Sequence, residues 1–418
     1  MNKRAPAWTI DRRQFIRIAS AAGGAGLLAS CKKESTGDTY SAPTSAPALP
    51  PPLATEREMV QMPEKASLIL LTDRPPQLET PIKYFATDLT PNEAFFVRWH
   101  LAVIPLSVDL NTFRLGIHGH VENELKLSVD DLKTQFEPVS IVAVNQCSGN
   151  SRSLFEPRVP GGQWTHGAVG NARWTGVRLA DLLKKAGVKP GAVQVSFQGL
   201  DRPVLPQTPA FIKALGMERA NHPDTIVAYA MNDQPMPMLN GFPIRLVVPG
   251  WYATYWVKAL NDVNVLAEPF KGFWMDKAYR VPAKDPHARE TPDKLATDTV
   301  PINAMTTRSL IVKPEDGQQL ATGTAVEVQG VAIDDGSGIA TVEVSTDSGK
   351  TWNPARLDAD LGRYSWRRWR YPWTPSAAGT SRIMARATNA KGQTQETEQW
   401  NRSGYARDVI EHVDVTIA

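Results

Sequence analysis

Hydrophobic and polar residues alternate over short stretches along most of this chain, and few stretches have the spacing of a helix. SIVAVNQ at 140–146 predicts a buried strand, and AVQVSFQG at 192–199 and PIRLVVPG at 243–250 predict further strands. RLADLLKKAG at 178–187 has helical periodicity and a glycine stop. The helix-poor, proline-punctuated pattern argues against a doubly wound parallel sheet. We therefore expect a mixed, β-rich domain over residues 66–295.

The pattern changes after this domain into a series of short alternating segments separated by Asp-Gly and Ser-Gly turns. These segments are AVEVQGVAI at 325–333, IATVEVSTDSGKTW at 339–352, RYSWRRWRYPW at 363–373 and SRIMARATN at 381–389. Segments of this length over about 100 residues are typical of an immunoglobulin-like sandwich. We expect such a domain over residues 300–418, with Trp352, Trp366, Trp369 and Trp373 in its core or an interface.

Composition fits two ordinary domains, because the 418 residues are 42% hydrophobic and 21% charged. The formal net charge of +3 is small and arises from a mixture of acids and bases. This charge does not indicate a nucleic-acid-binding surface. Any functional positive charge must therefore be local.

The first 31 residues resemble a twin-arginine export signal. DRRQFIR at 11–17 carries paired arginines, and the weakly apolar IASAAGGAGLLAS follows directly. An ordinary secretory signal with a chance Arg-Arg pair is the alternative. The apolar stretch is too short to cross a bilayer, and no later stretch reaches the required length. We therefore expect an exported, periplasmic protein without an integral span in its mature part.

Leu28-Ala29-Ser30-Cys31 also resembles a lipoprotein processing box, in which Cys31 becomes the acylated first residue of the mature chain. Under that hypothesis the N-terminal lipid is the chain's one membrane contact. The Pro/Ser/Thr-rich stretch that follows could not bury a core, so we expect a disordered linker over 32–65. Cleavage beyond Cys31, which removes this residue, is the alternative.

Cys147 is the second of the chain's two cysteines, and in an oxidising compartment it has no internal disulfide partner once Cys31 is removed or acylated. It must be buried, ligated or reactive. Its polar neighbours in AVNQCSGNSR favour a ligand in a loop over a core residue. The seven histidines have no zinc-binding spacing, and no haem or iron–sulfur motif is present. A single thiolate can serve a metal whose other ligands come from an organic cofactor.

Several motifs resemble those of the sulfite oxidase family of molybdopterin oxidoreductases, in its bacterial exported sulfite dehydrogenase type. They are CSGNSR, GAVGNARWTGVRLADLL, FFVRWHL, GLD, NGFPIRLVVPG and WVKAL. VEVSTDSGKTW resembles the family's dimerisation domain, so the resemblance covers roughly residues 80–415. It implies an α+β, β-rich molybdopterin domain followed by an all-β immunoglobulin-like dimerisation domain.

The resemblance implies a molybdenum ion held by one pyranopterin dithiolene, with Cys147 as the protein's metal ligand. An oriented, partly cationic set of donors suits such a cofactor. The positions that match the family's cofactor-binding residues are Arg98, Trp99, His100, Cys147, Asp201, Asn240, Arg245, Trp256, Val257 and Lys258. Trp99 and Asn240 depart from the animal-type pattern, which puts those two contacts in doubt. Arg245 lies within an apolar strand, where a charge needs a partner.

The resemblance also implies a catalytic pocket for a small oxyanion beside the metal. Its residues by position in the family motifs are Arg98, Cys147, Arg152, Trp164 and Tyr279. Arginine stays protonated and offers several donors, while a tyrosine hydroxyl and an indole N–H add directed hydrogen bonds. The family takes a further arginine from its C-terminal domain, but WNRSGYAR offers Arg402 and Arg407 without a clean match. His166 also stays unassigned.

The implied activity is oxidation of sulfite to sulfate by oxygen-atom transfer at molybdenum. Without a haem, flavin or nicotinamide motif in this chain, we expect a separate c-type cytochrome as electron acceptor. A twin-arginine route carries folded protein, which suits a cofactor inserted before export. The C-terminal domain indicates a homodimer, with a monomer or a complex with a cytochrome subunit as alternatives.

Other functions fit the same motifs. One is a sulfane dehydrogenase of a thiosulfate-oxidising complex, and another is a molybdopterin-dependent reductase of an oxidised sulfur substrate. Assimilatory nitrate reductases share the motifs but are cytosolic and carry extra electron-transfer domains. A binding lipoprotein that kept the fold without chemistry is the non-enzymatic alternative, and it predicts loss of Cys147, Arg98, Arg152 or Tyr279. All four are present.

Overall fold

A computed structural model of the chain describes residues 57–418. The predicted export signal, the processing box at Cys31 and the linker up to residue 56 lie outside the described residues. The described residues form one compact unit, so contacts between their N-terminal and C-terminal halves belong to one body.

The folded part begins before residue 66, which corrects the expected linker at its C-terminal end. Strand β1 (Met59–Gln61) pairs antiparallel with β2 (Ser67–Thr72). The side chain of Lys65 is buried and donates hydrogen bonds to the carbonyl oxygen of Asn92 and to Oδ1 of Asn240. A lysine can be buried here because these oxygens replace its lost hydration.

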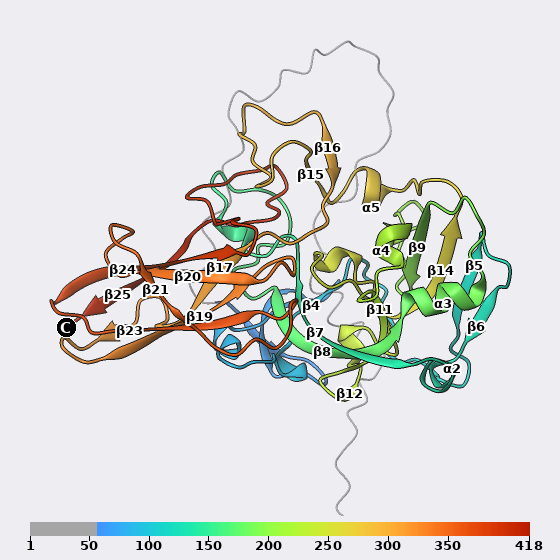
Figure 1. The fold of residues 1–418 in the computed structure, drawn as a ribbon, viewed down its shortest axis with the longest axis horizontal. Helices are drawn as coiled ribbons and strands as arrows, with labels where there is room; N and C mark the ends of the chain where they lie inside the picture. Colours follow the sequence, from blue (N-terminus) through green and yellow to red (C-terminus); the bar gives the residue numbers. More distant parts are fainter. Residues whose placement is uncertain (1–56) are drawn as a thin grey trace, which may run out of the picture. The chain divides into compact units, whose positions relative to one another are not determined.

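Three β-sheets make up most of the N-terminal half (Figure 1). The first has the order β1-β2-β3-β4 and adds β3 (Gln77–Glu79) and β4 (Val97–Arg98). The second has the order β10-β9-β14-β5-β6, with β5 (Leu115–Gly119), β6 (Leu125–Leu127), β9 (Gln194–Gly199), β10 (Ile212–Gly216) and β14 (Leu260–Leu266). The third has the order β12-β11-β8-β7, with β7 (Pro138–Gln146), β8 (Val169–Arg178), β11 (Ile226–Met231) and β12 (Gln234–Pro235). Strand β13 (Arg245–Val247) pairs with β11.

Helices are few and short in this half. They are α2 (Val129–Gln135), α3 (Leu179–Ala186), α4 (Met217–Ala220) and α5 (Phe273–Asp276), with the 3₁₀ turns η1 (Ile82–Ala86), η2 (Asn92–Ala94), η3 (Arg152–Leu154), η4 (Met238–Asn240) and η5 (Ala253–Tyr255). Helix α3 confirms the helix predicted at 178–187: its leucines are buried on one face, and Gly187 ends it at φ 68°. Glycine adopts this left-handed conformation without a Cβ clash.

The C-terminal half confirms the predicted β-sandwich. One sheet has the order β17-β19-β23-β22, with β17 (Arg308–Lys313), β19 (Val326–Ile333), β22 (Arg356–Leu357) and β23 (Arg367–Trp373). The other has the order β18-β25-β24-β20-β21, with β18 (Gln319–Leu320), β20 (Ile339–Ser345), β21 (Asn353–Pro354), β24 (Gly379–Asn389) and β25 (Glu411–Ile417). A two-stranded sheet of β15 (Arg280–Pro282) and β16 (Thr299–Pro301) precedes the sandwich in the chain.

Two of the four sandwich tryptophans are fully buried, in two different cores. Trp369 packs in the sandwich core, whereas Trp366 belongs to the larger core of the N-terminal half, where its ring centre lies 5.3 Å from that of Phe85. Trp366 therefore joins the two halves through apolar contact, which is the interface role expected for part of this group.

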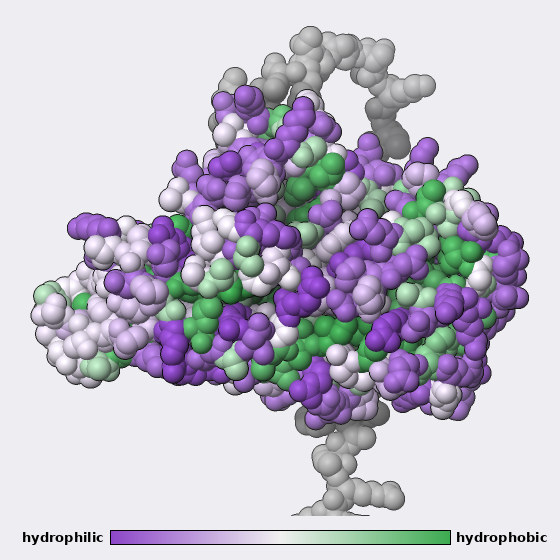
Figure 2. Space-filling model, viewed as in Figure 1, coloured by the Kyte–Doolittle hydropathy of each residue, from purple (hydrophilic) through white to green (hydrophobic). Residues whose placement is uncertain are grey.

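Hydrophilic residues cover most of the face seen in Figure 2, and hydrophobic residues occur among them in smaller groups. Within residues 57–418, no helix combines the length and the apolar character that a membrane span needs.

Candidate active site

The connection between β7 and β8 carries three of the predicted catalytic residues. Strands β7 and β8 pair as far as Gln146 and Val169, and the 22 residues between them hold Cys147, Arg152 and Trp164. The buried strand predicted at 140–146 is therefore confirmed, and it ends directly before the thiol.

Cys147 is buried at the start of a tight loop. Its backbone N–H donates to the carbonyl oxygen of Ala168 at 2.9 Å, and its own carbonyl accepts from the N–H of Asn150 at 3.0 Å. A further turn follows, in which the N–H of Arg152 donates to Gly149 at 3.1 Å. These backbone bonds fix the position of the thiol before any ligand is present.

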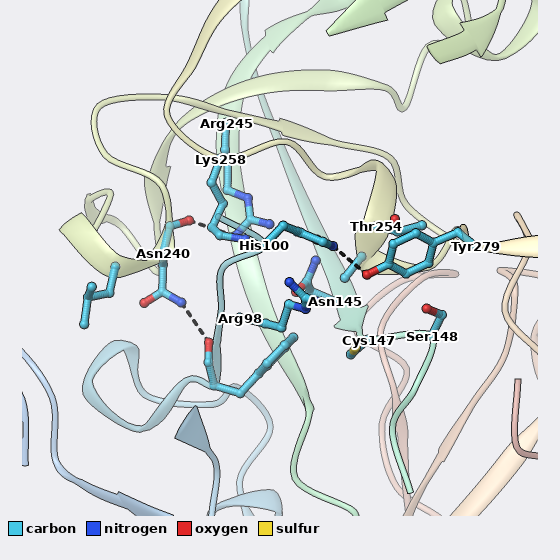
Figure 3. A pocket seen from close by; sticks show the side chains of 13 residues that line it. Arg98, His100, Asn145, Cys147, Ser148, Asn240, Arg245, Thr254, Lys258 and Tyr279 are labelled. Carbon is cyan, nitrogen blue, oxygen red and sulfur yellow. Dashed lines mark hydrogen bonds between the residues drawn. The ribbon is translucent and has the colours of Figure 1, made fainter. Parts of the chain in front are cut away.

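Cys147 and twelve other residues line a cavity inside the N-terminal half, here called the inner cavity (Figure 3). Six of the predicted cofactor-binding residues converge on it from separate segments. The lining residues are Phe96, Arg98, His100, Asn145, Cys147, Ser148, Leu239, Asn240, Arg245, Ala253, Thr254, Lys258 and Tyr279. The structure thus brings together Arg98, His100, Cys147, Asn240, Arg245 and Lys258, as predicted.

A second cavity, here called the outer cavity, shares Arg98, Cys147 and Tyr279 with the inner one. All five predicted catalytic residues line it. The full set is Gln77, Arg98, Cys147, Arg152, Pro160, Gly161, Gly162, Trp164, Trp274, Ala278, Tyr279, Arg402, Ser403 and Tyr405. Cys147 therefore borders two spaces, one lined by six of the predicted cofactor-binding residues and one lined by the five predicted catalytic residues.

Four predicted cofactor-binding residues, namely Trp99, Asp201, Trp256 and Val257, are absent from the described lining of the inner cavity. Trp99 and Trp256 lie beside the cations that do line it: Lys258 Nζ is 4.9 Å from the Trp99 ring centre, and the Arg245 guanidinium is 5.7 Å from that of Trp256. Val257 bonds through its carbonyl to the N–H of Leu246 at 2.9 Å. The side chains of Trp99 and Trp256 therefore contact the lining cations from outside the cavity.

Some lining residues were not predicted. Asn145 and Ser148 flank Cys147, and their polarity in that segment was the available signal. Thr254 lies in an ordinary-looking Tyr-Ala-Thr-Tyr segment that gave no signal. Arg402 and Tyr405 come from the C-terminal half, about 250 residues along the chain from Cys147. Arg402 was one of the two arginines left open in WNRSGYAR, whereas Tyr405 gave no signal.

The inner cavity is strongly cationic. Burial lowers the pKa of Arg245 to about 9, and burial together with the charge of Arg245 lowers the pKa of Lys258 to about 7. Burial also raises the pKa of Asp201 to about 6, against the opposing charge of Lys258. Because several cations share one buried space with a single nearby carboxylate, a bound anion would relieve their repulsion and restore their protonated forms.

Four polar atoms that line the inner cavity have no partner among the described residues. They are Asn145 Nδ2, Ser148 Oγ, Thr254 Oγ1 and Arg245 Nε. Buried polar groups in proteins are nearly always hydrogen-bonded, so orphans gathered around one cavity indicate a polar ligand that completes them. The cavity therefore suits a group rich in hydrogen-bonding atoms and carrying negative charge.

His100 and Tyr279 meet at the boundary of the two cavities. His100 Nε2 lies 2.5 Å from the Tyr279 hydroxyl (Figure 3). The imidazole also stacks on Phe211, with ring centres 3.6 Å apart. Burial and the charge of Arg98 lower the pKa of His100 well below its usual value, and burial raises the pKa of Tyr279. Both groups are therefore neutral near pH 7, and they supply a directed hydrogen bond without a charge.

Arg152 points into the outer cavity and is held from the C-terminal half. Its Nε donates to the carbonyl oxygen of Ser403 at 3.0 Å, and its guanidinium lies 5.1 Å from the ring centre of Tyr405. The Tyr405 ring in turn stacks on Tyr279 at 5.3 Å and 7°. Arg402, by contrast, donates from both Nε and Nη2 to the Glu290 carboxylate, which offsets its charge. Among the described residues, Arg98 and Arg152 line this cavity and donate to backbone carbonyl oxygens, without a carboxylate partner.

The fold and the two cavities define a molybdopterin oxidoreductase, as comparison with known families shows. Residues 100–274 match the family model described as the oxidoreductase molybdopterin binding domain. Residues 299–417 match the Mo-co oxidoreductase dimerisation domain. The chain is 32% identical over 381 residues to the sulfite oxidase of Gallus gallus, which covers 87% of this chain and 80% of that protein. The chain belongs to the sulfite oxidase family.

Two further comparisons agree. The mitochondrial sulfite oxidase of Macaca fascicularis is 34% identical over 368 residues, or 83% of this chain, and the chain spans 65% of that protein's length. The crystal structure of the sulfane dehydrogenase SoxCD from Paracoccus pantotrophus superposes with a TM-score of 0.71 at 23% identity, covering 90% of this chain and 92% of that one. At that identity the likeness supports the fold alone.

The residues of the inner cavity fit the cofactor that the family model names. Cys147 offers a soft thiolate for molybdenum. Arg98, Arg245 and Lys258 offer the cationic donors that a phosphate requires. The orphaned atoms of Asn145, Ser148 and Thr254 offer hydrogen bonds to a polar ring system. The inner cavity therefore contains residues suited to the metal, to the phosphate and to the polar ring system of this cofactor.

Proposed function

We propose that this chain is a molybdenum-dependent sulfite dehydrogenase that oxidises sulfite to sulfate. The observation that carries the proposal is that Arg98, Arg152, Trp164 and Tyr279 line the outer cavity together with Cys147. A small oxyanion in this cavity meets two guanidinium groups, an indole and a hydroxyl. It also lies beside the proposed metal ligand, where the chemistry takes place.

The protein residues bind and orient the substrate. Arg98 and Arg152 offset the charge of the anion, and the burial of Arg152 strengthens its electrostatic interaction. The hydrogen bond between His100 and the Tyr279 hydroxyl fixes the orientation of that hydroxyl. These contacts hold the bound anion in one orientation, whereas a collision in solution brings it to the reacting group in many orientations. When bound, the molybdenum cofactor supplies oxygen-atom transfer and the two-electron redox change.

The cellular setting forms part of the proposal. The twin-arginine segment and the processing box support a periplasmic protein exported in folded form, with a lipid at Cys31 as its proposed membrane contact. We infer a separate c-type cytochrome as the electron acceptor, because the sequence has no motif for a second redox group. The match to a dimerisation domain supports a homodimer.

The deciding experiment measures sulfite-dependent reduction of ferricyanide and of a c-type cytochrome by purified protein of known molybdenum content. Protein produced with tungstate in place of molybdate is the matched control, because it has the same chain with an inactive metal. We expect rapid reduction of both acceptors by the molybdenum protein and none by the control. If fully loaded molybdenum protein reduces neither acceptor, the proposal is wrong, and a protein-bound sulfane or a sulfoxide becomes the substrate to test.

A further inference from the structure

Ser151 connects the loop that carries Cys147 to the C-terminal sandwich. The Ser151 side chain is fully buried, and its hydroxyl oxygen accepts a hydrogen bond from Arg308 Nη2 at 3.0 Å. Arg308 is the first residue of β17 and is also fully buried. A charged side chain of the sandwich therefore reaches a residue that lies four positions after the proposed metal ligand.

The backbone of Ser151 is left-handed, with φ 67° and ψ 23°. Such a conformation is unfavourable for a residue with a Cβ and persists where surrounding contacts fix it. Two contacts come from the N-terminal half: the N–H of Ser151 donates to the carbonyl oxygen of Thr165 at 2.6 Å, and its hydroxyl lies 2.9 Å from His166 Nδ1. Arg308 supplies the third.

The hydroxyl of Ser151 can satisfy both side-chain partners at once. It accepts from Arg308 and has one hydrogen to donate, which reaches Nδ1 of a neutral His166. Burial lowers the pKa of His166 to about 4, so the imidazole is neutral near pH 7. Arg308 therefore donates to Ser151, and Ser151 donates to His166. These two hydrogen bonds fix the orientation of the Ser151 hydroxyl.

Arg308 is itself held by a buried carboxylate. Its Nη2 lies 3.2 Å from Glu411 Oε1, and the same oxygen accepts from Arg407 Nε at 2.9 Å. Burial by itself raises the pKa of Glu411, but the charges of Arg407 and Arg308 lower it to about 2, so Glu411 is ionised. Arg407 also donates to the carbonyl oxygen of Leu154 at 3.2 Å. One carboxylate of β25 thus anchors two arginines that hold both ends of a single turn.

The contacts from the C-terminal half continue on either side of Ser151. The N–H of Ala406 donates to the carbonyl oxygen of Ser148 at 2.9 Å, and Arg152 donates to that of Ser403 at 3.0 Å. Residues 148, 151, 152 and 154 therefore each bond to residues of the C-terminal half. This regular series of contacts follows the loop from the proposed metal ligand to the substrate arginine.

We propose that Arg308 is a positioning residue of the active site. By holding Ser151 in its left-handed conformation, Arg308 sets the directions of Cys147 at one end of the loop and of Arg152, the next residue, at the other. The sandwich then completes the active site of its own chain, a role separate from dimerisation. The effect on sulfite kinetics rests on the proposed function, whereas the effect on the loop does not.

The experiment compares Arg308→Met and Arg308→Lys in the full chain loaded with molybdenum. The matched control is Arg382→Met, which removes an exposed pair with Asp414 in the same sandwich; neither side chain bonds to residues 147–155. The first measurement is amide hydrogen exchange over residues 147–155 relative to the sandwich strands. The second is KM and kcat for sulfite with ferricyanide as the acceptor.

We expect Arg308→Met to accelerate exchange in residues 147–155 selectively and to raise KM for sulfite about tenfold or more, because small misplacements of a binding group are costly. We expect kcat to change less, since Arg98 remains. Arg308→Lys should restore part of the loss, because lysine keeps the charge but offers a single donor group. Arg382→Met should change neither measurement.

Unchanged loop exchange in Arg308→Met overturns the proposal, and so does faster exchange spread equally over the whole sandwich, which indicates a purely structural role. If Arg308→Met does not fold, Ser151→Gly replaces it: glycine tolerates φ 67°, removes the hydroxyl and leaves the Arg308–Glu411 pair in place. Faster loop exchange in Ser151→Gly supports the proposal, and unchanged exchange contradicts it. If the wild-type protein oxidises no sulfite, the function proposal fails alone, because the exchange measurement still tests the positioning role.

Discussion

Arg152 and Ser403 are 251 residues apart in the chain, yet the guanidinium Nε of Arg152 donates to the carbonyl oxygen of Ser403 at 3.0 Å. The segment that provides this carbonyl lies directly against the arginine. Gly404, the next residue, has φ 59°, and a Cβ built on it would lie 2.7 Å from Arg152 Cγ and 2.6 Å from Val159 Cγ2. The substrate arginine is therefore held by close contact with a glycine backbone.

Gly404→Ala should displace Arg152 and raise KM for sulfite about tenfold, because the new methyl group cannot share its space with Arg152. Gly392→Ala is the matched control. Gly392 also has a positive φ, of 78°, but no atom lies within 4 Å of its added Cβ. Both variants should lose about 1–2 kcal/mol of stability from backbone strain, so a KM change confined to Gly404→Ala isolates the contact. Equal KM values in the two variants would refute the expectation.

The sequence placed those parts of the site that depend on local patterns. The apolar run at 140–146 ends at Gln146, and the structure ends β7 there, so Cys147 was correctly assigned to a loop. Helix α3 was predicted for the same reason: leucine spacing and a terminal glycine are local properties that tertiary packing did not overrule.

Residues that reach the site through long-range contacts could not be predicted in this way. Arg402 and Tyr405 line the outer cavity because the C-terminal half packs on the loop after Cys147, and no local pattern encodes that contact. Similarly, Met59–Gln61 is a three-residue segment, too short for its own pattern to predict a strand, and it becomes one because β2 offers it a partner. Whether such a short edge segment forms a strand depends on the adjacent strand with which it can pair.

Cys147→Ser should abolish sulfite turnover while the fold is retained. Serine has nearly the same volume, but its hydroxyl is not deprotonated near pH 7 and is a harder ligand than a thiolate. The loss of stability should stay within about 1–3 kcal/mol, the cost of burying a hydroxyl without a partner. Turnover, molybdenum content and thermal unfolding measured on one preparation test this. Sulfite oxidation at a rate comparable to that of the wild type would disprove the assignment of Cys147 as the metal ligand.

Glu79→Gln should destabilise the segment that carries Trp164. The buried Glu79 carboxylate accepts from the N–H of Thr165 at 3.0 Å and from that of Gly167 at 2.9 Å. Glutamine offers one acceptor oxygen, so one buried N–H loses its partner at a cost of about 1–3 kcal/mol. Urea unfolding measures this cost. The exposed change Glu124→Gln serves as the control and should stay within about 0.5 kcal/mol; similar values for both would contradict the assigned role.

Lys213→Met should stabilise the protein relative to the wild type most strongly near pH 7 and less as the pH rises. Lys213 is fully buried, donates to the carbonyl oxygen of Trp274 at 2.7 Å and lies 5.2 Å from the ring centre of Tyr279. Burial, assisted by the charge of Arg280, lowers the pKa of Lys213 from 10.5 to about 7.

The pH dependence follows from proton binding. Between pH 7 and pH 10.5 the unfolded chain binds a proton at Lys213 that the folded chain has lost, so the unfolding free energy of the wild type rises with pH. Lys213→Met lacks this rise, and so does Lys213→Arg, because arginine stays protonated throughout the window. The stability of Lys213→Met relative to the wild type should therefore fall by more than about 1 kcal/mol between pH 7 and pH 9.5. Denaturant unfolding at these two pH values tests the sign, and parallel pH profiles for wild type and Lys213→Met would show that the folded protein keeps Lys213 protonated.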